Sequence, residues 1–317
     1  MFQVREFFGP EEGPHLLITG GVHGDEFEPM RAIRRLISGF EKNSPLQLLR
    51  GRVTFIPVVN EAAFLRGHRT AEDGLDLARI CPGHPEGTVT ERTAAAISER
   101  IREADLYIDL HTGGTELAVH PMCGYVLHDN PEVLSRQRRM ARAFNMPIVW
   151  GTSTDKSGRT LSIARDADVP AIYAEYLGSA SCNSEGTNAY VEGCLNVMAE
   201  FGMVDRSLPE PLAQLIAEDP RPDSGHMQVC NPSPMTGAFE PDVQLGEAVK
   251  AGDPLGTVRD MLGGREHEIP TPFDGVILVL RTFPRVRAGE TVGVVLDTTN
   301  HIVPREEWLR MVSDSPK

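Results

Sequence analysis

Short apolar runs alternate with helical patterns over roughly residues 15–200 of this chain of 317 residues. Between the runs, apolar side chains recur three or four residues apart, which is the period of a helix with one buried face. This alternation predicts an α/β fold with a mostly parallel mixed sheet and helices on both faces, because parallel strands need crossover connections that helices provide. The expected strands are 16–19, 53–59, 106–110, 147–150 and 171–176, and the expected helices are 29–37, 91–102, 131–144 and 187–201.

The pattern changes where prolines become dense. They predict a linker over 207–223, with at most one short helical turn over 212–217. Beyond it, short β-type runs punctuated by glycine and proline predict a small all-β, barrel-like domain over 224–317. Since single cores stop growing near roughly 250–300 residues, we expect a larger α/β domain over 1–206 and this smaller one.

Two octamers in the C-terminal part share one pattern. Residues 249–256 and 286–293 both follow V-[KR]-A-G-[DE]-x-[LV]-G. The repeat predicts two related hairpin turns, in the manner of a lipoyl-like barrel. Neither turn offers an obvious attachment lysine, so we do not expect a swinging-arm carrier.

Two of the expected strands end in residues that suit a metal ion. The first is followed by Gly-Val-His-Gly-Asp-Glu at 21–26, which puts an imidazole and a carboxylate three positions apart on the turn into a helix. The strand 106–110 runs into a histidine followed, after one threonine, by two glycines. The carboxyl ends of such strands meet at one crevice, and a catalytic zinc takes three ligands of this N and O chemistry plus a water. We therefore predict one Zn²⁺ per chain, held by His23, Glu26 and His111.

The apolar strand 171–176 contains one carboxylate, Glu175. A buried carboxylate is costly unless it is paired, hydrogen-bonded or close to a metal. Over the metal, burial raises its pKa while the cation lowers it, which suits a general base for an attacking water. The alternative, that Glu175 faces solvent at a strand end, stays open at this stage. Asp109 lies two residues before His111 on one strand face and is placed either to orient a ligand or to brace a neighbouring loop.

The segment after strand 53–59 carries three arginines, Arg66, Arg69 and Arg79. Loops that leave strand ends often hold substrate-positioning groups. A guanidinium fork matches a carboxylate and stays charged beside an oxyanion. A solvated surface is the simpler interpretation. In the sequence, the three arginines lie between the motif at 21–26 and His111, and this position favours a role in substrate binding.

Composition excludes several classes of partner. The formal net charge of −14 disfavours nucleic acid, which needs a basic stripe. The sequence contains no apolar run of membrane-spanning length and no N-terminal secretion signal, so we expect a cytoplasmic protein without a membrane partner. The five cysteines are odd in number and scattered, which argues against a disulfide framework. A homo-oligomer is compatible with the sequence.

Taken jointly and in order, these motifs resemble the succinylglutamate desuccinylase/aspartoacylase family of the zinc carboxypeptidase-like superfamily. The resemblance covers nearly the whole chain. It implies a zinc-dependent amidohydrolase that removes the acyl group from a small N-acylated amino acid or a related compound. It also implies that zinc is held by His23, Glu26 and His111 and that Glu175 is the general base and later the proton donor. Arg69 would stabilise the oxyanion, and Arg79 would bind a carboxylate of the substrate. We add Asn60 and Arg66 as expected substrate contacts.

One position departs from the family pattern. Ala78 stands where the family usually has an asparagine that helps to hold the substrate carboxylate, and alanine cannot donate that hydrogen bond. Because Arg79 remains, a substrate with a carboxylate stays one interpretation. Because the asparagine is missing, a substrate with a neutral or cationic group at this position stays open as a second one. Two other functions also stay open: a carboxypeptidase acting on short peptides, and a zinc-containing, non-catalytic binding protein. We expect the C-terminal domain to cover part of the crevice and limit access to small molecules.

Overall fold

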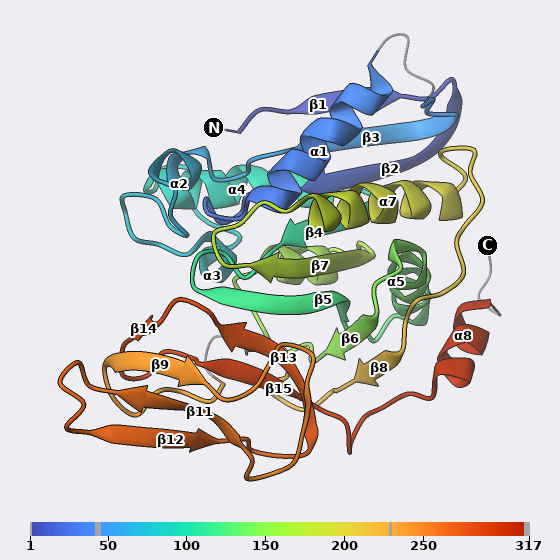
Figure 1. Ribbon diagram of the computed structural model, residues 1–317. Coiled ribbons are helices and arrows are strands. Elements are labelled where there is room, and N and C mark those ends of the chain that lie inside the picture. The colour runs from blue at the N-terminus through green and yellow to red at the C-terminus, as the bar shows by residue number, and fades with distance from the viewer. Residues whose placement is uncertain (1, 42–45, 228–229, 314–317) are drawn as a thin grey trace.

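The computed structural model describes residues 2–41, 46–227 and 230–313 and is built around an 11-stranded mixed sheet (Figure 1). The strand order is β1-β3-β2-β4-β7-β5-β13-β10, with β6 beside β5, β8 beside β6, and β15 beside β13. The pairs β2–β3, β2–β4 and β4–β7 are parallel, so the expected α/β class with a mixed sheet is confirmed. The strands that precede the C-terminal β region are β1 (Arg5–Phe8), β2 (Glu11–Thr19), β3 (Arg50–Ile56), β4 (Leu106–His111), β5 (Leu117–Val126), β6 (Ile148–Thr152), β7 (Ala171–Gly178) and β8 (Leu215–Glu218).

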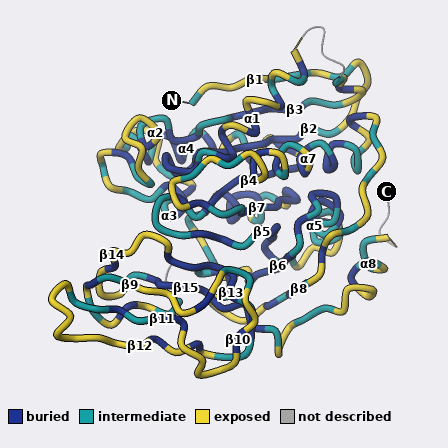
Figure 2. Tube along the Cα trace, in the orientation of Figure 1, coloured by how far each residue is buried: buried dark blue, intermediate teal, exposed yellow. Residues whose placement is uncertain are grey.

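Helices cover both faces of this sheet. Buried residues of α1, α5, α7 and α8 share one apolar core with one face, and residues of α3, α4 and α6 share a second core with the other. The central strands between the two layers are almost entirely buried (Figure 2). The helices are α1 (Phe27–Phe40), α2 (Glu61–Arg66), α3 (Leu77–Ile80), α4 (Val89–Arg102), α5 (Pro131–Phe144), α6 (Thr160–Asp166), α7 (Ser184–Glu200) and α8 (Arg305–Ser313).

Local sequence signals explain why some of these boundaries were predictable. α5 begins at Pro131 behind Asn130, whose side chain accepts a hydrogen bond from the Glu132 amide, and it ends at Asn145 in the left-handed conformation. An Asx cap, a proline in the first turn and a left-handed C-cap are all standard helix boundaries. None of the described helices is long and apolar enough to cross a membrane.

The sequence analysis missed β5, the strand that joins the two halves of the molecule. β5 runs antiparallel to β7 and parallel to β6. His120 and Pro121 interrupt its apolar pattern, and the register with β7 shifts between Val119 and Met122. A bulge is where a strand tolerates proline, because the ladder is already interrupted there. The same irregularity hides the strand from a periodicity argument.

The C-terminal β region continues the central sheet. β13 (Gly275–Arg281) pairs antiparallel with β5, and β10 (Ala248–Val249) and β15 (Gly293–Asp297) pair with β13. A second, four-stranded sheet closes a separate apolar core against these strands. Its strands are β12 (Glu266–Pro270), β11 (Pro254–Arg259), β9 (Gly237–Pro241) and β14 (Arg285–Val286).

Two details of the predicted organisation differ from the structure. The short helical turn expected over 212–217 is wrong: β8 forms there and pairs parallel with β6, because pairing at this sheet edge satisfies the backbone of a proline-flanked segment. The region expected to be all-β ends in α8, whose Trp308 is fully buried in the core of the α/β half. The domain boundaries themselves stay a prediction.

The two octamers form matched turns but not hairpins. Gly252 and Gly289 occupy equivalent positions with φ of 89° and 88°, a region in which glycine carries no steric penalty. However, the first turn connects β10 to β11 and the second connects β14 to β15, and in each case the two strands belong to different sheets. The expectation of hairpins is therefore wrong, since each repeat carries the chain from one sheet to the other.

Candidate metal and catalytic site

The candidate site lies at the carboxyl ends of β2 and β4, as the sequence predicted. His23 and Glu26 sit in the turn from β2 to α1, and His111 is the last residue of β4. The turn passes directly against α2. A Cβ atom on Gly24 would lie 2.0 Å from the carbonyl carbon of Ala63, so this approach requires glycine. The backbone contact explains the glycine that directly follows His23 in the motif.

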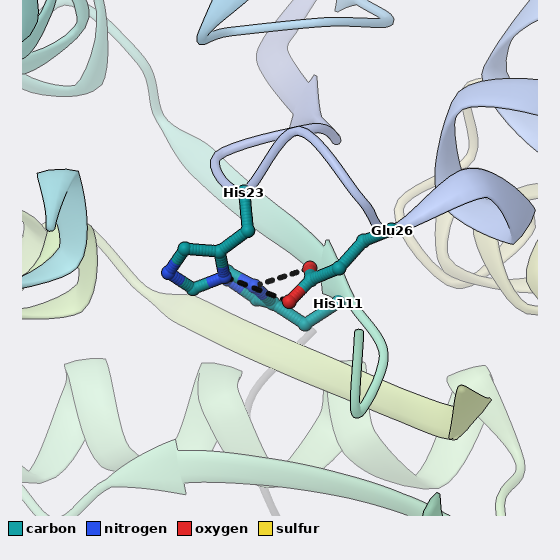
Figure 3. Close-up of side chains that lie close together, drawn as sticks. All are labelled: His23, Glu26 and His111. Carbon is teal, nitrogen blue, oxygen red and sulfur yellow. Dashed lines mark hydrogen bonds and ion pairs between the residues drawn. The ribbon is translucent and has the colours of Figure 1, made fainter. Parts of the chain in front are cut away.

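Three side chains converge at this edge (Figure 3). His23 Nδ1 lies 2.7 Å from Glu26 Oε1, and His111 Nδ1 lies 3.1 Å from Glu26 Oε2. One potential ligand atom from each residue lies within 4.8 Å of the others, and all three residues are buried. Two imidazole nitrogens and one carboxylate oxygen match the donor set of a three-ligand catalytic metal site. The predicted metal-binding triad is thus confirmed.

Each histidine of the triad contacts a second carboxylate with its other ring nitrogen. His111 Nε2 lies 3.1 Å from Asp109 Oδ2, and His23 Nε2 lies 3.1 Å from Asp76 Oδ1. Carboxylates in this position fix the tautomer and orientation of a metal-binding imidazole. Asp109 also accepts hydrogen bonds from the hydroxyls of Thr19 and Thr160, so it is held rigidly. The orienting role predicted for Asp109 agrees with these contacts.

Asp76 connects the metal triad to Arg69. Its Oδ2 accepts hydrogen bonds from Arg69 Nη2 at 2.9 Å and Nε at 3.1 Å, while Oδ1 also caps α3 by accepting from the Ala78 amide. Burial would raise the pKa of Asp76, but His23 and Arg69 hold it well below its usual range. The sequence analysis gave Asp76 no role, because the four-residue helix that it caps was not predicted.

Asp76→Asn is expected to weaken metal binding about 10–100-fold, because an amide oxygen holds the histidine and arginine less strongly than a carboxylate. Titration of the metal-free protein with Zn²⁺ measures this change. The matched control is Asp73→Asn in the same loop, where the carboxylate accepts from Thr90 and does not touch the triad. Equal Zn²⁺ affinity of the two variants would show that Asp76 does not support His23.

Glu175 lies on β7 directly beside the triad. Its register partner on β4 is His111, and the residue is 7% exposed. Among the described residues, its Oε2 atom has no hydrogen-bond partner. Burial raises the pKa of Glu175 to about 7. The solvent-facing alternative for Glu175 is therefore wrong, and the side chain lines the same cavity as the triad histidines.

This cavity of about 80 Å³ also brings three arginines to the site: Arg69, Arg79 and Arg159. Burial lowers the pKa of Arg79 to about 10 and lowers that of Arg159, and the two guanidinium groups repel each other. Buried like charges in one cavity favour an anionic guest. Arg159 precedes α6 as its N-cap residue and was missed, since a single loop arginine gives no sequence signal.

Other residues singled out in the sequence occupy different places. Ala78 is buried and lines the cavity with Arg79. Asn60 caps α2 by accepting from the Ala63 amide, and Arg66 is exposed and donates to the carbonyls of Thr70 and Ala71. Their expected role in substrate binding stays a prediction.

Residues 12–201 match the model of the succinylglutamate desuccinylase/aspartoacylase catalytic domain. The chain belongs to this family. It is also 30% identical over 296 residues to the N-alpha-acetyl-L-2,4-diaminobutyric acid deacetylase of Halomonas elongata, a match that spans 92% of this chain and 84% of that relative. The family resemblance seen in the sequence is thereby confirmed.

Solved structures of family members share the whole architecture. The succinylglutamate desuccinylase/aspartoacylase of Rhodobacter sphaeroides superposes with a TM-score of 0.80 at 27% identity, covering 93% of this chain and 88% of that one. The product-bound ectoine utilization protein EutE (DoeB) of Ruegeria pomeroyi gives 0.81 at 26% identity, with 92% and 87% covered. As predicted, the chain is an amidohydrolase that removes acyl groups from N-acyl amino compounds.

Proposed function

We propose that this family member is a zinc-dependent deacylase of small N-acetylated amino acids. The observation that carries the proposal is that one cavity is lined by both triad histidines, by three arginines and by Glu175, whose Oε2 has no hydrogen-bond partner in the described part of the chain. A metal ligand set, a base and anion-binding groups are the parts that hydrolysis of an N-acyl amino acid requires.

His23, Glu26 and His111 would hold the zinc ion, which supplies Lewis-acid polarisation of the amide carbonyl and makes water more acidic. Glu175 takes a proton from the attacking water and later gives it to the leaving amine, a task that suits a carboxyl group whose pKa is near neutral. Arg69, held in place by Asp76, donates to the oxyanion that forms at the carbonyl oxygen. Each role is a proposal that rests on position and on charge.

The substrate class follows from the cavity and from the relatives. Arg79 and Arg159 supply two cations on one side of Glu175, which suits the carboxylate of an amino acid. Ala78 stands where the family usually has an asparagine that helps to bind the substrate carboxylate. Arg159 thus offers this carboxylate a second cation beside Arg79. The deacetylase of Halomonas elongata, with 30% identity over most of both chains, favours an acetyl group.

The C-terminal β region argues against a peptidase groove. Val279 of β13, together with Met227, lines a cavity of about 40 Å³ beside Glu26 and His111. A carboxypeptidase needs an open groove on the acyl side of the scissile bond, whereas a cavity of this size has room for only a few water-sized groups. We therefore propose that access is limited to small molecules.

A substrate panel tests the function. Protein loaded with Zn²⁺ should hydrolyse N-acetyl amino acids faster than N-succinyl amino acids and faster than C-terminal peptide bonds. A chelator should remove the activity, and added Zn²⁺ should restore it. Release of the free amine measures the rate. Hydrolysis of peptides but not of N-acyl amino acids would overturn the proposal in favour of a carboxypeptidase.

A further inference from the structure

A small pocket with three aliphatic side chains lies beside the metal triad, on the side where β13 of the C-terminal region joins the central sheet. Leu117 and Val119 of β5 and Val279 of β13 line the cavity of about 40 Å³ that also contains Glu26, His111 and Glu175. Val119 and Val279 are direct register partners across the β5–β13 pair. They are 2% and 0% exposed, so their side chains form a fixed wall.

This pocket contrasts with the cavity on the other side of the same residues. Both cavities are lined by His23, Arg69, His111 and Glu175, whereas Arg79 and Arg159 line only the cationic one. An amide bond between Glu175 and the triad would therefore have the cavity with Arg79 and Arg159 on one side and the smaller cavity with Leu117, Val119 and Val279 on the other. The amino acid carboxylate belongs with the two arginines, which leaves the acyl group for the smaller cavity.

We propose that Leu117, Val119 and Val279 form the acyl pocket and restrict this enzyme to short acyl groups. The inference rests on the proposed deacylase function and adds the residues that choose the acyl group. A cavity of about 40 Å³ has room for a few water-sized groups, since one water needs at least roughly 10–15 Å³.

Leu117 sets the length limit. Together with Arg69 and Gly113 it lines both the acyl pocket and a larger cleft of about 470 Å³, and it is the aliphatic side chain of the three that stand at this boundary. The cleft is lined on its far side by Arg281 and Arg285, which form ion pairs with Glu116 and Glu290. A longer acyl chain would have to pass Leu117 to reach this cleft, whereas Val119 and Val279 limit the width of the pocket.

The experiment compares acyl lengths within single variants. Leu117→Ala and Val279→Ala are assayed as Zn²⁺-loaded protein on N-acetyl, N-propionyl, N-butyryl and N-succinyl derivatives of one amino acid. We expect the butyryl-to-acetyl ratio of kcat/KM to rise about tenfold or more, the size of effect that one or two methylenes give in an apolar pocket. The control is Val276→Ala, the same truncation on β13 outside the residues that line the pocket, which should leave the ratio unchanged.

Direct binding gives a second measurement. Calorimetry with acetate and butyrate should show that Leu117→Ala increases the affinity for butyrate relative to the affinity for acetate. This measurement does not depend on turnover. A ratio within one variant does not depend on how much protein is folded. If the unaltered protein hydrolyses no N-acyl amino acid, the proposed function fails. If it hydrolyses the acetyl compound but neither variant shifts the ratio, or if it already accepts succinyl and butyryl groups equally well, the acyl pocket is wrong.

Discussion

Glu175→Gln is expected to lower kcat on an N-acetyl amino acid about 10²–10⁴-fold while the protein keeps its metal, because the amide cannot accept the proton of the attacking water. The substitution preserves size and adds no charge to a residue that is 7% exposed. The metal ligands are separate residues, so the content of bound metal should equal that of the unaltered protein. Single-turnover rates and metal analysis of the same sample measure the two quantities.

The matched control is Glu28→Gln, the same isosteric change at another buried carboxyl group. Glu28 accepts hydrogen bonds from the Ser181 hydroxyl and the Asn183 amide, and a glutamine oxygen can still accept both. This variant should retain activity. A Glu175→Gln protein with full zinc content and unchanged turnover would remove Glu175 from the mechanism.

The pH dependence of the unaltered enzyme follows from the same carboxyl group. Burial raises the pKa of Glu175 to about 7, and the charged form is the one that accepts a proton. The value of kcat/KM should therefore rise with pH as Glu175 loses its proton. A nearby dication favours the charged carboxylate, so in the zinc-loaded protein the midpoint of the rise in kcat/KM should lie below pH 7. The residual activity of Glu175→Gln should lack this limb.

The strands that hold the metal triad were predictable because they are buried on both faces. Such strands are continuous apolar runs, and Leu106 to Leu110 ends directly at His111. Each of the two strands is followed by glycines and a histidine, and the first also by a glutamate. Few sequence patterns other than a metal site combine these residues. The metal site needed only local sequence and the rule that parallel strands end at one edge.

The acyl side of the site could not be predicted in the same way. It depends on β5, which a proline and a bulge conceal, and on the pairing of Val119 with Val279, residues that lie 160 positions apart. No local pattern encodes a contact at that distance. Arg159 is a similar case, because only the packing of its loop against the residues around Gly225 brings it to the cavity.

Arg69→Ala is expected to lower kcat about 10²–10³-fold, the usual cost of removing one oxyanion donor. Its guanidinium forms two hydrogen bonds with Asp76, and it lines both the cationic cavity and the acyl pocket, where the carbonyl oxygen must lie. An interaction made only in the transition state changes kcat and kcat/KM together and leaves KM nearly constant. Arg69→Lys should recover part of the rate, since it restores charge without the paired contact to Asp76.

The control for Arg69→Ala is Arg92→Ala, an exposed arginine on α4 that donates to the Gly87 carbonyl and should leave kcat unchanged. A second outcome separates the two roles that an arginine can have here. If Arg69→Ala raises KM and spares kcat, Arg69 binds the ground-state substrate as Arg79 and Arg159 are proposed to do. The oxyanion would then depend on the metal ion alone, and the contact between Asp76 and Arg69 would serve substrate binding instead of the chemical step.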